Sequence, residues 1–119
     1  MLIREANTQD VKSLNALMNE GFGWENKDDF SEGFFSNKNI FCLVAESEED
    51  QIMGTSSLHI IEKINCKVGL IEDVVVSEKF RGKLVASSLV NELISISKKE
   101  GCYKTILKTD SKQYLFIKN

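Results

Sequence analysis

The feature that most constrains the fold is a strand, a glycine-containing turn, a helix and a second strand in succession. Residues Val68–Val76 end in three consecutive valines, which is typical of a buried strand. An Arg81-Gly82 turn follows, and then a helix that ends at Gly101. Its core-facing residues recur at helical spacing: Ala86, Leu89, Val90, Leu93, Ile94 and Ile96. Since Tyr103–Thr109 forms the next predicted strand, we expect a right-handed crossover between two parallel strands.

The other segments predict a mixed α/β (α+β) sheet. Further strands are expected at Leu2–Ala6, Ile40–Ala45 and Gln51–Ile61, where apolar residues with strand propensity gather. Helices are expected after the Asn7-Thr8 cap up to Gly21, at Asp28–Ser36, and finally at Ser111–Lys118. The predicted element order is β-α-α-β-β-β-α-β-α.

Length and composition narrow the class of protein. The 119 residues suit a single domain, residues 1–119. A net charge of −3 argues against nucleic-acid partners, which need a basic surface. No apolar run approaches the length of a membrane span, and the charged start Met1–Ala6 does not resemble a signal peptide. We therefore expect a cytoplasmic protein without a membrane or nucleic-acid partner.

The numbers and spacing of cysteine and histidine argue against a metal site. The cysteines Cys42, Cys66 and Cys102 are odd in number and widely spaced, so neither a disulfide framework nor a zinc site is expected. His59 is the only histidine and lies in a predicted strand. Any catalytic triad would depend on it, and a core-strand histidine without a catalytic role is the simpler interpretation. No metal is expected.

The Arg81-Gly82 turn is the first candidate binding element. A helix N-terminus presents unpaired N–H groups and a positive dipole end to an anion, and Arg81 adds charge there. Any tight strand-to-helix turn with a glycine is the competing interpretation. The turn is not a P-loop, because the upstream glycine and the Ser/Thr of G-x-x-x-x-G-K-[ST] are missing around Gly82-Lys83.

Three segments together carry a family resemblance: Ile71–Val76, Arg81–Lys83 and Gly101–Lys104. Their motifs and spacing resemble the GCN5-related N-acetyltransferase (GNAT) superfamily, and within it the glucosamine-6-phosphate N-acetyltransferases. The resemblance is strongest over Ile71–Leu107. It implies acetyl-CoA as co-substrate and transfer of acetyl to the primary amine of a small molecule, with glucosamine 6-phosphate as the candidate acceptor.

The resemblance also implies roles for particular residues. For the cofactor, it implies a backbone site for the pantetheine arm at Val74, Val75 and Val76, and a pyrophosphate cradle at Arg81, Gly82, Lys83, Leu84, Val85, Ala86 and Ser87. For substrate and catalysis, it implies the carboxylates Glu72 and Asp73, together with Tyr103 and Lys104 in the substrate pocket. Adjacent strand residues point to opposite faces, so only one of Glu72 and Asp73 can reach the amine unless the strand is bulged.

The sequence departs from the family at its C-terminal end. Ile117 stands where the family has the tyrosine that protonates the leaving thiolate, and Tyr114 is the expected substitute, one helical turn earlier. Leu84 stands at the second glycine position of the family's turn. The chain ends at Asn119, so we expect it to lack the family's last two strands. That loss would leave Tyr103–Thr109 as an unpaired sheet edge, which a homodimer could cover.

Two functional classes remain open. The first is an acetyl-CoA-dependent N-acetyltransferase, expected to be slow because Ile117 has no proton to give. The alternative is a truncated, weakly active or inactive CoA-binding or interaction module. A small α/β interaction domain without a ligand would require the shared motifs to be accidental.

Overall fold

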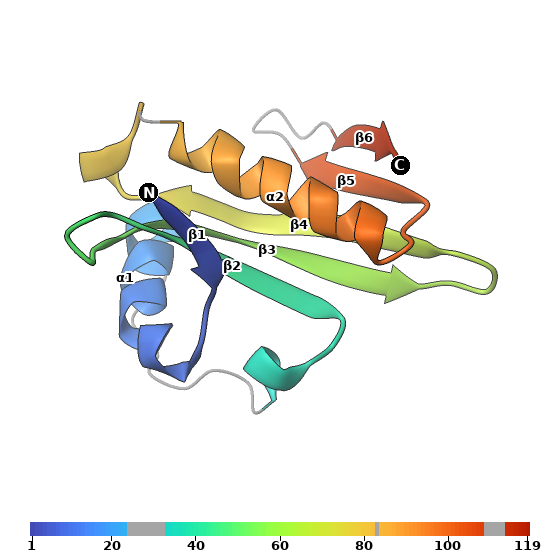
Figure 1. Cartoon of the computed structure of the whole chain (residues 1–119), viewed down its shortest axis with the longest axis horizontal. Helices are drawn as coiled ribbons and strands as arrows, with labels where there is room; N and C mark the ends of the chain where they lie inside the picture. The colour runs from blue at the N-terminus through green and yellow to red at the C-terminus, as the bar shows by residue number, and fades with distance from the viewer. Residues whose placement is uncertain (24–32, 83, 109–113) are drawn as a thin grey trace.

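The computed structural model describes residues 1–23, 33–82, 84–108 and 114–119, with only the backbone for residues 108, 114–116 and 118. The described residues form one six-stranded sheet whose strands follow chain order (Figure 1). The strands are β1 (Leu2–Glu5), β2 (Ile40–Glu46), β3 (Ile52–Glu62), β4 (Lys67–Val76), β5 (Lys104–Lys108) and β6 (Tyr114–Lys118). Neighbours are antiparallel except β4 and β5, which are parallel.

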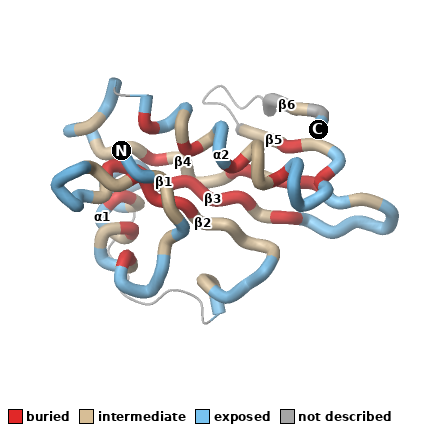
Figure 2. The backbone as a smooth tube through the Cα atoms, in the orientation of Figure 1, coloured by how far each residue is buried: buried red, intermediate tan, exposed pale blue. Residues whose placement is uncertain are grey.

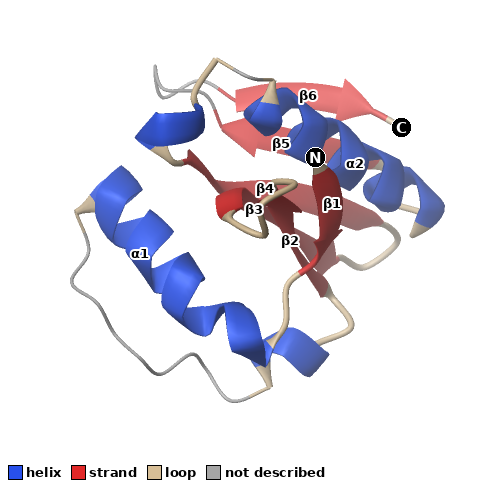
Figure 3. Ribbon diagram, turned by 60° about the vertical axis from the view of Figure 1, so that its left-hand side comes forward, coloured by secondary structure: helices blue, strands red, loops and turns tan. Residues whose placement is uncertain are grey.

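Two helices cover opposite faces of this sheet, α1 (Val11–Phe22) on one and α2 (Val85–Lys99) on the other (Figure 3). The main core lies under α2, and the buried positions follow the central strands (Figure 2). Its buried members are Leu43, Ala45, Met53, Leu58, Ile60, Ile71, Val85, Leu89, Leu93 and Cys102. Neither helix, nor any other helix in the described ranges, is long and apolar enough to cross a membrane.

The predicted mixed sheet is confirmed, and so is the crossover from β4 through α2 to β5. Strands occur at all the expected places, and α2 leads from β4 to a parallel β5 as the crossover rule requires. The expected helix Asp28–Ser36 lies largely outside the described residues. Its last residues, Phe34–Ser36, form a single 3-10 turn.

The prediction for the C-terminal segment is wrong. Residues Tyr114–Lys118 form strand β6 and not part of a helix Ser111–Lys118. Aromatic and β-branched residues favour a strand there, and the free edge of β5 supplies the hydrogen-bonding partner. The edge of Tyr103–Thr109 is therefore paired within the chain, and the reason for expecting a homodimer at that edge no longer holds.

Buried polar contacts fasten this part of the sheet to α2. The Thr105 hydroxyl donates to the Ser97 hydroxyl at 2.7 Å, and the Asn119 amide donates to Thr105 at 3.0 Å and to the Cys102 carbonyl at 3.1 Å. At Gly69 an added Cβ would lie 2.5 Å from Ser97 Oγ, so α2 approaches β4 closely. The last residue of the chain thereby stabilises the β5–β6 pair beneath the helix.

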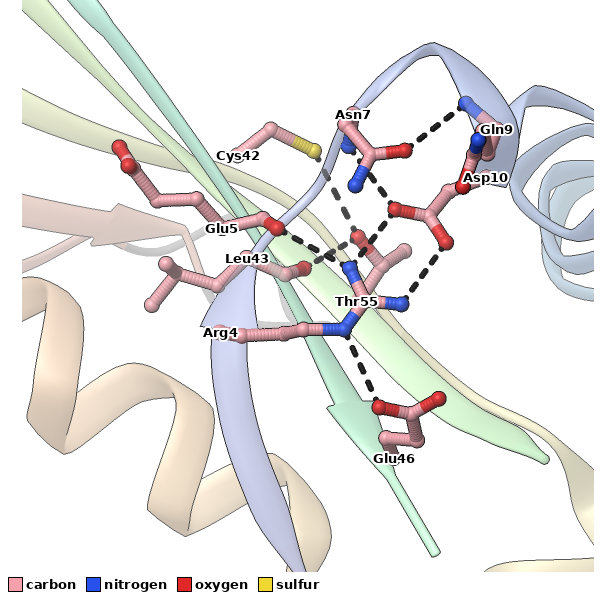
Figure 4. A network of polar contacts seen from close by, with 9 residues as sticks. All are labelled: Arg4, Glu5, Asn7, Gln9, Asp10, Cys42, Leu43, Glu46 and Thr55. Atoms are coloured by element: carbon pink, nitrogen blue, oxygen red, sulfur yellow. Dashed lines mark hydrogen bonds and ion pairs between the residues drawn. The ribbon is translucent and has the colours of Figure 1, made fainter. Parts of the chain in front are cut away.

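An ion-pair network joins β1 to the start of α1 and to the end of β2 (Figure 4). The Arg4 guanidinium donates to both oxygens of the buried Asp10 carboxylate at 2.9 Å, and its Nε donates to Glu46 at 3.1 Å. Asp10 also accepts from the Asn7 backbone at 2.8 Å in a capping box. The bonds from Arg4 hold the pKa of Asp10 below its ordinary value of 3.8, despite its burial.

We expect Arg4→Met to lower the free energy of unfolding at pH 7 by about 2 kcal/mol, between the values for exposed and buried pairs. Because the folded-state pKa of Asp10 is lowered, its pair contributes stability above the unfolded value and loses it as the pH falls through the folded value. Urea unfolding of both proteins from pH 7 down to pH 2 measures this. The difference should shrink in acid. Glu46→Gln, which leaves the Arg4–Asp10 pair intact, should cost less than about 1 kcal/mol. A difference that does not change with pH would contradict this account.

Candidate functional site

A cleft of about 600 Å³ opens where β4 passes beyond its neighbour β5. The parallel pairing ends at Ile71 and Leu107, so residues 72–76 extend past it as a strand paired only to β3 among the described residues. The volume is typical of a ligand site. An extended strand with a free edge presents N–H and C=O groups to a ligand that carries amides.

The cleft contains every predicted cofactor residue that the structure describes. It is lined by Val74, Val75, Val76, Arg81, Gly82, Leu84, Val85, Ala86 and Ser87. Lys83 lies outside the described residues. Gly21 and Phe22, at the end of α1, also line the cleft and were not predicted. The sequence gives no local signal for these two residues, because only the packing of α1 on the sheet brings this helix end to β4.

Two features hold the end of α1 against the cleft. An added Cβ at Gly21 would lie 2.9 Å from a methyl group of Val75, so only glycine allows the helix to approach β4 this closely. The Glu20 carboxylate accepts from the Glu78 backbone at 2.6 Å and from the Ser77 hydroxyl at 3.3 Å. These contacts join α1 to the segment that leads from β4 to the Arg81-Gly82 turn. Both walls of the cleft are thus tied together.

The floor of the cleft includes the N-terminus of α2. No side chain caps this end, and no acidic residue lies in the first turn. The first N–H groups of a helix have no partner within it, so those of Val85, Ala86 and Ser87 suit an anion together with the helix dipole. Arg81 is exposed beside them, and its Nε donates to the Val76 carbonyl at 3.3 Å.

Leu84, the N-cap of α2, has a left-handed backbone conformation with φ of 61°. The residue is 75% exposed. This conformation is costly for any residue with a Cβ and is free for glycine. Glycine, which the resemblance to the family places here, would adopt this conformation without strain.

We expect Leu84→Gly to raise the free energy of unfolding by about 0.5–1 kcal/mol, because the relief of backbone strain exceeds the extra entropy of the unfolded chain. Leu84→Ala, which keeps the Cβ and the strain, should bring no such gain. Chemical denaturation of the three proteins checks the pair. Equal stability of the glycine and alanine variants would contradict the strain argument.

A β-bulge in β4 decides where the two predicted carboxylates lie. The β3–β4 register shifts between Thr55 and Ser57, and Asp73 has a positive φ of 57°. Ile71 and Val74 both pack into the core under α2, although residues three apart on a regular strand face opposite sides. Glu72 and Asp73 therefore both lie off that core, on the face covered by α1. The bulge thus meets the condition under which both carboxylates can face one substrate.

Asp73 is partly buried, and His59 and Cys42 lie in its surroundings. Burial raises the pKa of its carboxyl above the ordinary value, and the charge of His59 partly opposes this. Burial also raises the pKa of the nearby Cys42 thiol, with a further contribution from Asp73. Within the described ranges, no group of three or more His, Cys, Asp or Glu side chains could hold a metal ion.

The remaining predicted residues lie elsewhere on the sheet. Tyr103 and Lys104 stand at the other end of β4, where Lys104 pairs with Val68, about 13 Å along the strand from Glu72. One chain therefore does not bring them to the carboxylates. Tyr114 pairs with Lys108 at the carboxyl end of β5, where β4 and β5 separate, while Ile117 pairs with Thr105 farther back. The helical turn that was to relate Tyr114 to Ile117 does not exist.

Comparisons with known proteins agree with this geometry. The Acetyltransferase (GNAT) family matches residues 10–114. Glucosamine 6-phosphate N-acetyltransferase of Arabidopsis thaliana is 40% identical over 76 residues, which are 61% of this chain and 51% of that protein. The chain spans about half the length of the curated relatives it matches.

Solved structures show the same fold. A Trypanosoma brucei acetyltransferase superposes with a TM-score of 0.76 at 30% identity, over 93% of this chain and 84% of the other. The crystal structure of glucosamine-6-phosphate N-acetyltransferase from Arabidopsis thaliana gives 0.73 at 32% identity, over 92% and 82%.

Proposed function

Because the chain belongs to the GNAT acetyltransferase family, we propose that it transfers the acetyl group of acetyl-CoA to the primary amine of a small molecule. The observation that carries the proposal is the cleft at the end of β4. It combines a free strand edge, an uncapped helix N-terminus and two carboxylates on the adjoining sheet face. Glucosamine 6-phosphate is the proposed acceptor, since relatives with 38–41% identity carry that name.

Each part of the cleft suits one part of the cofactor. The backbone of Val74–Val76 offers hydrogen bonds to the amides of the pantetheine arm. The N–H groups of Val85–Ser87, the helix dipole and Arg81 favour the pyrophosphate. Gly82 has φ of 80°, and an added Cβ would meet no atom within 4 Å, so this position faces open space at the cleft.

We expect Gly82→Asp to weaken acetyl-CoA binding at least threefold, about 0.65 kcal/mol, because it places a negative charge beside the pyrophosphate. Gly82→Asn is the matched control, since asparagine also tolerates a positive φ and has nearly the same size without the charge. It should weaken binding less. Isothermal titration with acetyl-CoA measures both. A loss below threefold for aspartate, or equal losses for the two variants, would show that the pyrophosphate lies elsewhere.

The proposed reaction begins with the loss of a proton by the substrate ammonium. Asp73 accepts it: the N–H bond breaks, its electron pair stays on nitrogen, and an O–H bond forms. A raised pKa makes this carboxyl a better proton acceptor than an ordinary aspartate. The amine then attacks the thioester carbon, and the tetrahedral oxyanion meets a backbone N–H of the β4 edge. Collapse breaks the C–S bond, whose electron pair leaves on sulfur, while the nitrogen gives up its second proton to restore the acid that protonates the thiolate. Overall, one proton, the one taken up by Asp73, is released to solvent.

The leaving thiolate needs a proton, and we assign its donor to Tyr114. Its backbone pairs with Lys108 at the carboxyl end of β5, the end at which β4 and β5 separate. Position 117 pairs three residues farther back along β5, so isoleucine there costs the reaction nothing if Tyr114 is the donor. The expectation of slow turnover then applies only to a chain in which Tyr114 does not act as the donor.

We expect Asp73→Asn and Tyr114→Phe each to lower kcat/KM at least about 100-fold while acetyl-CoA still binds, since each removes one proton transfer. Thiol release with acetyl-CoA and glucosamine 6-phosphate measures turnover, and isothermal titration measures binding. Thermal unfolding at pH 7 controls for folding. If the unaltered chain binds acetyl-CoA but transfers acetyl to none of a panel of amines, the inactive CoA-binding module is favoured.

A further inference from the structure

Ser57 and His59 of β3 form a polar pair that the proposed reaction does not use. Their neighbours Leu58 and Ile60 pack into the core under α2, so Ser57 and His59 lie on the opposite face of the sheet. This is the face to which the bulge directs Glu72 and Asp73. Ser57 is 4% exposed and stands directly opposite Glu72 in the register, while His59 stands opposite Leu70.

The hydrogen bonds of Ser57 indicate which ring nitrogen of the neutral His59 imidazole carries the proton. The Ser57 hydroxyl donates to the Glu72 carbonyl at 3.3 Å, and its oxygen lies 2.9 Å from His59 Nε2. A hydroxyl has one proton, so a hydroxyl that gives it to the carbonyl accepts from Nε2–H. The lone pair of the neutral ring is then on Nδ1, and protonation there produces an imidazolium without breaking the bond to Ser57.

The charge of His59 acts on Asp73 across the β3–β4 pair. It opposes the effect of burial, which raises the pKa of the Asp73 carboxyl. Other charged or titratable groups on this face among the described residues include Glu72 on β4, Cys42 and Glu46 on β2, Asp10 before α1 and, toward the other end of the sheet, Lys104 on β5. Arg4 pairs with Asp10, and the Cys42 thiol is held neutral by burial. His59 is therefore the basic side chain of this cluster whose charge reaches Asp73.

Resting on the proposed function, we propose that His59, oriented by Ser57, is the positioning residue that keeps the Asp73 carboxylate charged and ready to accept the proton of the substrate amine. His59 acts through Asp73 and transfers no group itself. The carboxylate must be ionised before it takes a proton, so its cationic neighbour extends the pH range in which the reaction can begin.

The test is the pH dependence of kcat/KM for acetyl transfer by the full chain. The acidic limb of the profile should move to higher pH by about one unit in His59→Gln, because Asp73 loses an opposite charge. Ser57→Ala should move it in the same direction by less. Ser56→Ala is the matched control: its hydroxyl also donates to the Glu72 carbonyl at 3.3 Å but has no contact with His59, so the limb should stay in place.

A second measurement does not depend on activity. NMR titration of carbon-13-labelled aspartate follows the Asp73 carboxyl in the unaltered protein and in His59→Gln, where its midpoint should rise. A midpoint and an acidic limb that both stay in place would overturn the role of His59 while leaving the acetyltransferase proposal intact. Absence of acetyl transfer by the unaltered chain would overturn the proposed function and, with it, this role. A limb that moves equally in Ser56→Ala and Ser57→Ala would show a structural effect only.

Discussion

The extra residue in β4 reorients every side chain of the strand that follows it. Before the bulge Ile71 packs under α2, and after it Val74 and Val76 do so again, while Val75 meets Gly21 of α1. The two residues in between, Glu72 and Asp73, are left together on the α1 face. A regular strand would have sent one carboxylate into the apolar core, where an unpaired charge is costly. Asp73 accepts the left-handed backbone that the bulge needs, as aspartate does more readily than most residues.

The cleft depends on the unequal lengths of β4 and β5. Pairing between them stops at Ile71 and Leu107, and α2 starts beyond the end of β4, so a strand edge and a helix N-terminus come to line the same cleft. Backbone groups that the described strands and helices leave unpaired are thereby concentrated in one place, where the proposed cofactor would bind. The strain at Leu84 belongs to the same turn. It arises because a residue with a Cβ holds the left-handed backbone position that ends the turn.

Contacts far from the cleft determine its shape. Glu20 ties α1 to the segment after β4, and the Arg4–Asp10 pair holds the first residues of α1 on the sheet. On the other side, Asn119 and Thr105 anchor the β5–β6 pair to Ser97 of α2. The helices are therefore fixed to the sheet by polar contacts at their ends and by apolar packing along their lengths. Both helices must be held on the sheet in this way for the walls of the cleft to face each other.

Local patterns determined much of this protein: the strand before the Arg81-Gly82 turn, the amphipathic helix after it, the parallel return to β5, and the cleft residues that belong to β4, the turn and the start of α2. Each follows from periodicity, turn chemistry or a motif within a short stretch of chain. Only the tertiary structure decided the rest. The bulge at Asp73 comes from a register shift between two strands, Gly21 and Phe22 reach the cleft through helix packing, and Tyr114–Lys118 became a strand because β5 had an edge to pair. These outcomes depend on partners distant in sequence, which local propensity does not contain.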